Sequence, residues 1–491
     1  MRKILYITAI ALAATMSAVA QTSDTLRVAT LRDERWWGLF NDTQTTQPFN
    51  TPFTADLSGR SSTMPLLVSS QGRYIWAPDA TAIEFDGKTF SVACSDATAV
   101  TGKKGRTVRE AYLYCIHRYV WPESQHEIIL PKTPIYVFPA GTDLKSENVA
   151  GTVLIPDGWQ SYCDDHIFDL NVFPDPQRDF DVTTDAGYKT ILTVTPYIPA
   201  CGRPYTDALK RGDLLTGDDS RPVIFSSEAG YFACLDVTVP HVRERIRAML
   251  AELHTVYGIE TFLFDCSQIL PELSADKRED FSFWWKSVCE AYPGSVTGIS
   301  DGTVERWHPT AFMPATNATW QSLADTLTAI IAAGFSGYTY PCMPSCTTAG
   351  GDELLQLRIL QLAAMMPLPV IYHVEDIFSS EKLNEALANT YAQRLAMLSY
   401  TEELLRESTS TGEPTVRHMD YQFPGEGFAD CDDQYMLGAE YLIAPVTDPS
   451  GKRTVRLPKG RWQDCDGTKY KGPRVVNIDV SDGKIPVFKA L

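Results

Sequence analysis

The chain has 491 residues, which is too long for one hydrophobic core and predicts roughly two to four domains. Its hydrophobic content of 44% and charged content of 21% are ordinary for a globular protein and exclude a disordered chain. The formal net charge of −18 repels polyanions, so we expect no nucleic acid partner and an uncharged ligand instead.

The first predicted element is a secretory signal over residues 1–20. Arg2 and Lys3 precede an apolar run that extends to about Met16, and Ala18 and Ala20 supply the small residues of a cleavage site. The alternative is a membrane anchor, but the run is shorter than the ~20 residues that a spanning helix needs. We therefore expect an exported protein, periplasmic or secreted, with no membrane span after cleavage.

Residues 21–145 favour strands and predict an N-terminal domain that resembles a β-sandwich. The runs are short, carry β-branched and aromatic residues, and are separated by Gly, Pro, Asp and Ser. The predicted strands include Met64–Val68, Gly72–Trp76, Thr89–Val92 and Tyr112–Ile116.

Residues 146–408 alternate between strands and helices, which indicates parallel β/α architecture and predicts a (β/α)8 barrel, also called a TIM barrel. Predicted strands are Thr152–Ile155, Thr190–Val194 and Ile259–Phe264. A helix begins at Pro240, a favoured first position, and ends at Gly258. Two more helices are predicted near residues 353–365 and 382–406.

Residues 409–491 return to strands and predict a small C-terminal β-sandwich. The predicted strands are Tyr441–Ala444, Thr454–Leu457, Val475–Ile478 and Ile485–Phe488. The predicted fold class is therefore α/β: a barrel flanked by two β-sandwich domains.

Acidic residues follow two of the predicted barrel strands. Asp265 comes directly after a buried strand, and the active site of such a barrel lies at the carboxyl ends of its strands. The alternative is an Asp that caps a strand-to-loop junction. Asp157 follows its strand in the same way, with Trp159, Asp164 and Asp165 just beyond. Acids and aromatic rings at these ends are typical of a sugar-binding pocket.

Cysteine and histidine are scattered. The eleven Cys include no CxxC pair, and Cys342 and Cys346 are close enough to bridge, an alternative that the sequence leaves open. The eight His form no metal-ligand pattern, so we expect no metal cofactor.

The C-terminal quarter closely resembles family 31 glycoside hydrolases. The segments that carry the resemblance are Gly412–Arg417, Asp432–Gly438, Tyr441–Val446, Leu457–Trp462 and Ile485–Phe488. Upstream, Val153–Trp159 and Tyr257–Asp265 are similar to the family's first pocket strand and its nucleophile strand. The second of these looks most like the branch that contains the myogenesis-regulating glycosidase.

The resemblance implies retaining hydrolysis of α-linked glycosides without a metal, with Asp265 as the nucleophile. A carbohydrate, either an α-glycoside or an oligosaccharide, is then the expected partner. The candidate substrate-binding residues are Asp157, Trp159, Asp164, Asp165 and His373.

Several pocket positions depart from the family pattern. Pro156, Gln268 and Cys342 stand where acidic residues are expected, and the acid/base Asp is replaced by Ala315 or Asn317. Residues 133–149 are too few for the family's first β/α unit, so the barrel is predicted to have a shortened first unit. The nearby groups that could replace the acid are Asp301, Glu305 and His308.

The sequence is therefore consistent with two functions. The first is an active α-glycosidase whose acid/base is unidentified or lost. The second is a glycan-binding or scaffold protein that kept the barrel and lost turnover. A third, an aldolase-like barrel, would need a Schiff-base Lys or a metal cluster at the strand ends, and the sequence has neither.

Overall fold

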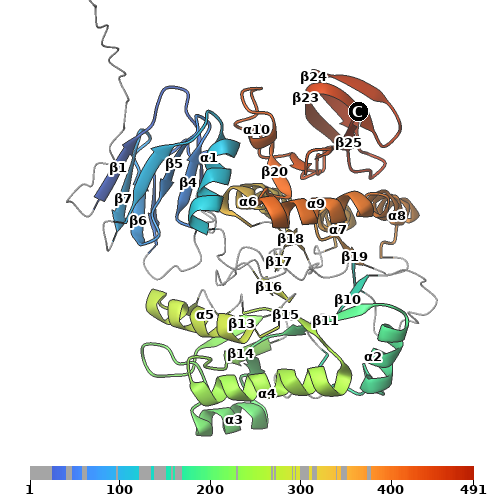
Figure 1. Cartoon of the computed structure of the whole chain (residues 1–491). Coiled ribbons are helices and arrows are strands. Elements are labelled where there is room, and N and C mark those ends of the chain that lie inside the picture. The colour runs from blue at the N-terminus through green and yellow to red at the C-terminus, as the bar shows by residue number, and fades with distance from the viewer. Residues whose placement is uncertain are drawn as a thin grey trace, which may run out of the picture.

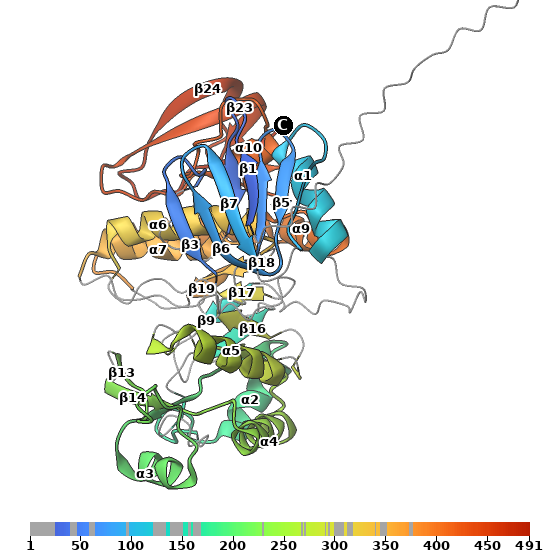
Figure 2. The ribbon, with the colours of Figure 1, turned by 90° about the vertical axis from the view of Figure 1, so that its left-hand side faces the viewer.

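The computed structural model describes most of the chain after residue 24. The described residues are 25–39, 47–57, 64–94, 98–120, 134–137, 151–155, 159–160, 168–227, 230–266, 269, 272–289, 291–292, 295–298, 309–311, 318–338, 340–343, 351–372 and 377–491. The predicted signal over residues 1–20 lies outside them. N-terminal and C-terminal sheets lie on one side of helices α6 (Trp320–Ala333), α7 (Glu353–Ala364) and α9 (Leu398–Thr411). The helices from α2 (Pro176–Asp185) to α5 (Ala275–Cys289) lie on the other side (Figures 1 and 2).

The N-terminal part contains two antiparallel sheets of four strands. In sheet order, the first is β1 (Thr25–Ala29), β7 (Thr89–Cys94), β6 (Ala80–Phe85) and β3 (Phe53–Asp56). The second is β2 (Trp36–Gly38), β4 (Leu66–Ser69), β5 (Arg73–Trp76) and β8 (Val100–Lys103). Side chains from both sheets, including Trp36, Ile75, Ile83 and Phe90, form one buried cluster. The predicted N-terminal strands therefore form two sheets that share a core.

One predicted N-terminal strand is wrong, because Tyr112–Ile116 lies in a helix. Helix α1 spans Val108–Cys115 and continues into a π-helical turn, η1 (Ile116–Val120). Thr107 and Glu110 form a capping box, in which each side chain accepts a hydrogen bond from the other residue's backbone N–H. The cap starts a helix that overrides the strand propensity of the aromatic run. Helix α1 covers β4, which is why all four residues of β4 are buried.

The centre of the molecule is a parallel sheet of eight strands. In sheet order these are β18 (Tyr340–Cys342), β17 (Pro309–Ala311), β16 (Val296–Gly298), β15 (Thr261–Phe264), β11 (Lys189–Val194), β10 (Thr152–Ile155), β9 (Ile135–Val137) and β19 (Val370–Tyr372). Leu368, just before β19, donates a backbone hydrogen bond of 3.4 Å to Pro341 in β18. The two outer strands of this order are therefore connected.

Strand β9 corrects the predicted boundary at residue 146. It pairs in parallel with both β10 and β19, so the central sheet already begins at Ile135. A run of three residues carries too little periodicity to be recognised as a strand. The first β/α unit, although short, therefore contributes strand β9 to the central sheet.

Helices surround the central sheet. Those that precede β18 are α2 (Pro176–Asp185), α3 (Gly202–Arg211), α4 (Pro240–Tyr257), α5 (Ala275–Cys289) and α6 (Trp320–Ala333). A small antiparallel sheet, in the order β12 (Tyr197–Pro199), β14 (Gly230–Cys234) and β13 (Ile224–Ser227), lies between β11 and α4 along the chain. The prediction for α4 is confirmed, because Gly258 ends it in the left-handed conformation with φ 69°.

The later helices match the prediction in part. Helix α7 (Glu353–Ala364) agrees with the predicted range, but the single helix predicted over residues 382–406 is two helices. They are α8 (Glu381–Leu395) and α9 (Leu398–Thr411), with Ala396 and Met397 between them. The break coincides with Arg394, whose buried guanidinium binds carbonyls of the turn after α7. Arg394 thus connects the end of α8 to α7 through contacts that a periodicity argument does not include.

The C-terminal part is one antiparallel sheet rather than two separate sheets. Its order is β20 (Val416–His418), β21 (Tyr435–Leu437), β22 (Tyr441–Ile443), β25 (Val487–Ala490), β23 (Lys452–Asp464) and β24 (Lys469–Asp479). Strand β25 pairs with both β22 and β23, which makes the sheet continuous. The short helix α10 (Met419–Gln422) contributes Met419 to the core of this part.

Buried polar contacts connect the N-terminal and C-terminal parts. Arg109 of α1 donates to the Glu413 carboxylate at 2.8 Å through Nε, and the Tyr421 hydroxyl donates to the same carboxylate at 2.7 Å. Trp37 also connects the N-terminal part to the central part, because it stacks on Phe335, just after α6, with ring centroids 5.1 Å apart. Within the described part of the chain, no helix has the length and apolar content to cross a membrane.

Candidate active site

Asp265 lies at the carboxyl end of an internal strand of the central sheet. It directly follows β15, and its backbone N–H donates to the Val194 carbonyl at 3.0 Å, which extends the pairing with β11. Strands β11 and β16 flank β15. The residue is 8% exposed, so the carboxyl group lies almost entirely inside the protein. This is the place in a parallel β/α sheet where ligands bind.

Strand alternation gives the direction of the Asp265 side chain. Phe262 and Phe264 belong to the cluster that includes residues of α4 and α5, whereas Leu263 belongs to the other large cluster, with Ile191 and Leu154. Successive side chains of a strand point to opposite faces. Asp265 therefore continues the face of Leu263 and points away from the layer of α4 and α5.

Thr195 is the neighbour of Asp265 on β11. Because Val194 pairs with Phe264, the next residues of both strands lie side by side. Thr195 is 7% exposed, and among the described residues its hydroxyl has no hydrogen-bond partner. Sequence reasoning missed this residue. Its only signal was a polar side chain that directly follows a buried strand and precedes Pro196.

The register continues from Asp265 toward the edge of the sheet through Gly298 and Ala311 to Cys342. Phe264 pairs with Thr297, Gly298 with Ala311, and Ala311 with Cys342. Cys342 is fully buried, and burial raises the pKa of its thiol to about 12. The thiol therefore stays protonated near neutral pH. It cannot supply the negative charge of the Asp that the family resemblance leads us to expect there.

Trp159 lies elsewhere than predicted. It is 1% exposed, its indole N–H donates to the Thr193 carbonyl at 2.7 Å, and its ring packs on Phe168 with centroids 4.8 Å apart. Both rings belong to the cluster that contains Phe264, on the opposite face from Asp265. A buried ring whose N–H is already bonded packs the core, so the structure does not bring Trp159 together with Asp265.

The other candidates lie outside the described residues and stay predictions. Asp157 comes two positions after β10, and His373 directly follows β19, so both follow strands of the same sheet as Asp265. The remaining positions outside the described residues are Asp164, Asp165, Gln268, Asp301, Glu305, His308, Ala315 and Asn317. Where the structure describes the chain, no three His, Cys, Asp or Glu gather as metal ligands.

Comparisons with known proteins relate the chain to one family. Residues 412–490 match the model of the glycosyl hydrolase family 31 C-terminal domain. The myogenesis-regulating glycosidase of Mus musculus is 26% identical over 347 residues, which cover 64% of this chain and 48% of that protein. An α-xylosidase of Lactiplantibacillus pentosus is 32% identical over 127 residues, 24% of this chain and 17% of that enzyme. The chain thus spans at most about half the length of these relatives.

Solved structures show the same relationship at the level of fold. A family 31 sulfoquinovosidase from E. rectale, in complex with an aza-sugar inhibitor, has a TM-score of 0.73 at 17% identity over 95% of this chain and 82% of that one. A family 31 α-xylosidase from a soil metagenome, complexed with xylose, has a TM-score of 0.71 at 18% identity over 95% of this chain and 79% of that one. The chain therefore has the fold of these enzymes and is related to family 31.

Proposed function

We propose that this relative of family 31 glycosyl hydrolases is an exported glycosidase that cleaves α-linked glycosides with retention, with Asp265 as its nucleophile. The observation that carries the proposal is a nearly buried carboxyl group at the carboxyl end of an internal parallel strand. The relationship to glycosidases adds the reaction class. Export rests on the apolar run and small residues before residue 21.

The proposed site requires that the eight parallel strands enclose it. The hydrogen bond from Leu368 to Pro341 supports a closed (β/α)8 barrel, because it connects β18 with the segment leading into β19. In such a barrel, the strand ends that carry Asp157, Asp265 and His373 surround one pocket. The proposed substrate-binding residues are therefore Asp157, Asp164, Asp165 and His373.

The chemistry proposed for Asp265 takes place in two steps. A carboxylate oxygen attacks the anomeric carbon, the bond to the leaving group breaks, and the leaving group takes the electron pair. Water then hydrolyses the glycosyl ester and restores the carboxylate. An alkoxide leaving group needs a proton from a second carboxyl group about 5 Å away in retaining enzymes, and this help is worth about 10²–10⁴ in rate.

A second candidate is a glycan-binding protein on the same fold that has lost turnover. It is favoured by the replacements at Pro156, Cys342 and the segment of Ala315 and Asn317. The buried thiol of Cys342 stays protonated because burial raises its pKa, so it does not replace the negative charge of a carboxylate at that position. In this function Asp265 would accept a hydrogen bond from a sugar hydroxyl.

Release of fluoride from a panel of α-glycosyl fluorides distinguishes the two candidates. Fluoride departs without a proton, so the reaction tests Asp265 independently of any acid. We expect release with at least one sugar, and its loss in Asp265→Asn. As a control, Asp207→Asn, a half-buried carboxylate of α3 that pairs with Arg203 and Lys210, should retain the rate. If no sugar in the panel releases fluoride, the glycosidase proposal fails and the binding function takes its place.

A further inference from the structure

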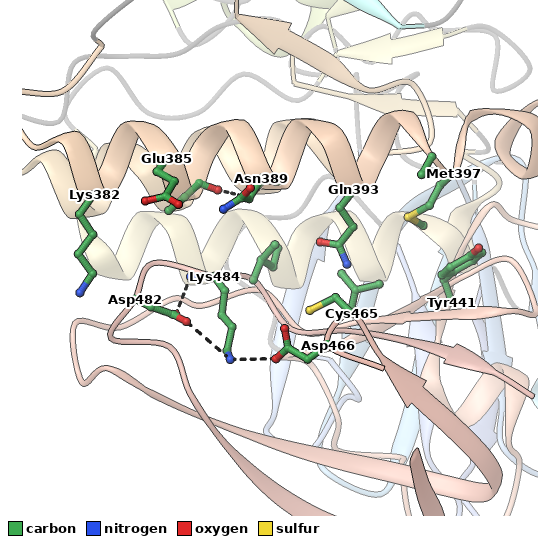
Figure 3. Close-up of a pocket in the computed structure, with 15 residues that line it drawn as sticks. Lys382, Glu385, Asn389, Gln393, Met397, Tyr441, Cys465, Asp466, Asp482 and Lys484 are labelled. Carbon is green, nitrogen blue, oxygen red and sulfur yellow. Dashed lines mark hydrogen bonds and ion pairs between the residues drawn. The ribbon is translucent and has the colours of Figure 1, made fainter. Parts of the chain in front are cut away.

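A groove lies between helix α8 and the C-terminal sheet, lined by a different set of residues from the candidate active site. Its volume is about 660 Å³. One wall is a face of α8 that carries Glu385, Asn389 and Gln393, four residues apart each time. This spacing places them on successive turns of the helix, over roughly 12 Å from first to last. Figure 3 shows these side chains along α8, opposite the loops of the C-terminal sheet.

The opposite wall is polar, but its charges are paired. Lys484 contacts Asp466 at 3.3 Å and Asp482 at 3.7 Å. Lys382, at one end of the groove, donates to the Ser481 carbonyl at 2.8 Å. Both lysines that line the groove are therefore engaged, and acids outnumber them. A phosphate or carboxylate ligand would find no available cation there.

The side chains of α8 differ from this wall because their hydrogen-bonding groups are available. Within the described part of the chain, the side chains of Asn389 and Gln393 make no hydrogen bond, and that of Glu385 makes neither a hydrogen bond nor an ion pair. An amide offers two donor hydrogens and an acceptor oxygen, and a carboxylate offers acceptors only. The wall formed by α8 therefore presents both donors and acceptors, from side chains about one helical turn apart.

Little apolar surface faces the groove. Met397, Ile485 and Val487 lie behind its lining and are each at most 3% exposed, and the half-buried Tyr441 borders it. The groove therefore offers a ligand mainly hydrogen bonds, which suits a ligand that carries many hydroxyl groups. A sugar ring has this character, and a row of such rings fits a groove whose wall repeats at each turn.

The position of the groove relates it to the candidate active site. Helix α8 follows β19 along the chain, and the helix begins at Glu381 after β19 ends at Tyr372. A helix that follows a parallel strand starts at the carboxyl end of the sheet and runs back. The first turn of α8, with Lys382 and Glu385, therefore lies toward the edge at which Asp265 is found.

From these observations we propose that the groove between α8 and the C-terminal sheet is a second, non-catalytic binding site for a neutral oligosaccharide, with Asn389 and Gln393 as its hydrogen-bonding residues. The sugar class rests in part on the proposed function, whereas binding in the groove requires no turnover. Two linked sites increase the apparent affinity for a chain long enough to occupy both, and leave the affinity for a small glycoside unchanged.

Affinity electrophoresis tests this site directly. The full chain carrying Asp265→Asn, which prevents digestion of the matrix, is run in gels that contain soluble starch, dextran or xyloglucan. We expect at least one glucan to slow migration. With Asn389→Ala and Gln393→Ala added, the dissociation constant should rise by at least about tenfold, because two hydrogen-bonding groups are lost. Gln321→Ala, an exposed amide on α6, is the matched control and should change nothing.

The same groove changes in the otherwise unaltered chain should leave the release of fluoride from α-glycosyl fluorides at its normal rate. This arm separates the two proposals, because fluoride release depends on Asp265 and gel retardation depends on the groove. The near-isosteric pair Asn389→Asp and Gln393→Glu, which removes donors and keeps shape, guards against misfolding and should also weaken retardation. Migration unaffected by all three glucans, or slowed equally with and without the groove changes, would overturn the proposal.

Discussion

Arg394 is expected to be one of the most sensitive positions for the stability of the helical layer. Its side chain is fully buried in α8, and it donates to the carbonyls of Ala364 and Met366 at 3.0 Å and to the Thr401 hydroxyl at 2.7 Å. These contacts connect α7, α8 and α9. Replacing Arg394 with Met retains an unbranched, apolar side chain and removes all of the donors.

The size of the effect follows from two opposing terms. Each hydrogen bond to a charged group contributes about 1.5–3 kcal/mol. Burial lowers the pKa of this guanidinium to about 10 from its ordinary 12.5, so keeping the charge inside the protein costs about 3 kcal/mol, which the substitution recovers. The three short bonds lost, against one charge recovered, leave a net decrease of about 3 kcal/mol in the free energy of unfolding, in line with other buried charged networks. The fourth bond, to the Pro367 carbonyl at 3.4 Å, is long and adds little.

Urea denaturation followed by tryptophan fluorescence measures this decrease. Arg406→Met, on the exposed side of α9, removes the same charge and should change the free energy of unfolding by less than about 0.5 kcal/mol. Arg394→Lys retains a charge but has a single donor centre, and we expect an intermediate value. An Arg394→Met protein as stable as Arg406→Met would refute the reasoning, because the buried contacts would then contribute nothing.

Three further predictions concern the site and its surroundings. If the acid/base group is lost, azide should accelerate turnover of a glycosyl fluoride, because this anion attacks the glycosyl ester without a general base; no acceleration would mean that a base is present. Thr195→Val should leave stability unchanged or raise it by about 1–3 kcal/mol, since it removes a buried hydroxyl without a partner; a lower melting temperature would contradict this. Burial raises the pKa of Asp420 to about 6 from 3.8, so the folded state holds this proton more tightly than the unfolded state, and stability falls as pH rises between these values. Asp420→Asn should remove this loss, up to about 3 kcal/mol at neutral pH, and equal pH dependence of the two proteins would count against it.

The sequence was most informative where local rules agree with tertiary packing. Helix α4 begins at Pro240 and is capped by Gly258. Its apolar residues at helical spacing are buried, except Val256, which is 41% exposed; the buried ones are Val242, Ile246, Met249, Leu250 and Leu253. Asp265 could be proposed from the sequence because it directly follows the apolar run Phe262–Phe264. In both cases the signal is local in the sequence: residues that begin and end a helix in the first, and an apolar run followed by an acidic residue in the second.

Most of the errors arose where distant contacts decide the outcome. The strand expected over Tyr112–Ile116 became α1, because a capping box and the surface of β4 favour a helix. The helix predicted over residues 382–406 is divided at Ala396 and Met397, close to Arg394, whose side chain bonds carbonyls at the end of α7. Trp159 lies in the core, where the ring of Phe168, nine residues later, packs on it. The capping box is a local signal that the strand prediction overlooked, whereas Phe168 and the carbonyl partners of Arg394 are distant in sequence and lie outside any periodicity argument.

The central claim is that Asp265 forms a covalent bond to a sugar. Intact mass of the protein after incubation with the α-glycosyl fluoride panel, followed by peptide mapping, measures this bond. We predict a mass increase of one glycosyl unit on the peptide that contains Asp265, absent in Asp265→Asn and long-lived if the group that activates water is lost. Release of fluoride with the adduct on another residue, or with the same adduct in Asp265→Asn, would contradict the account.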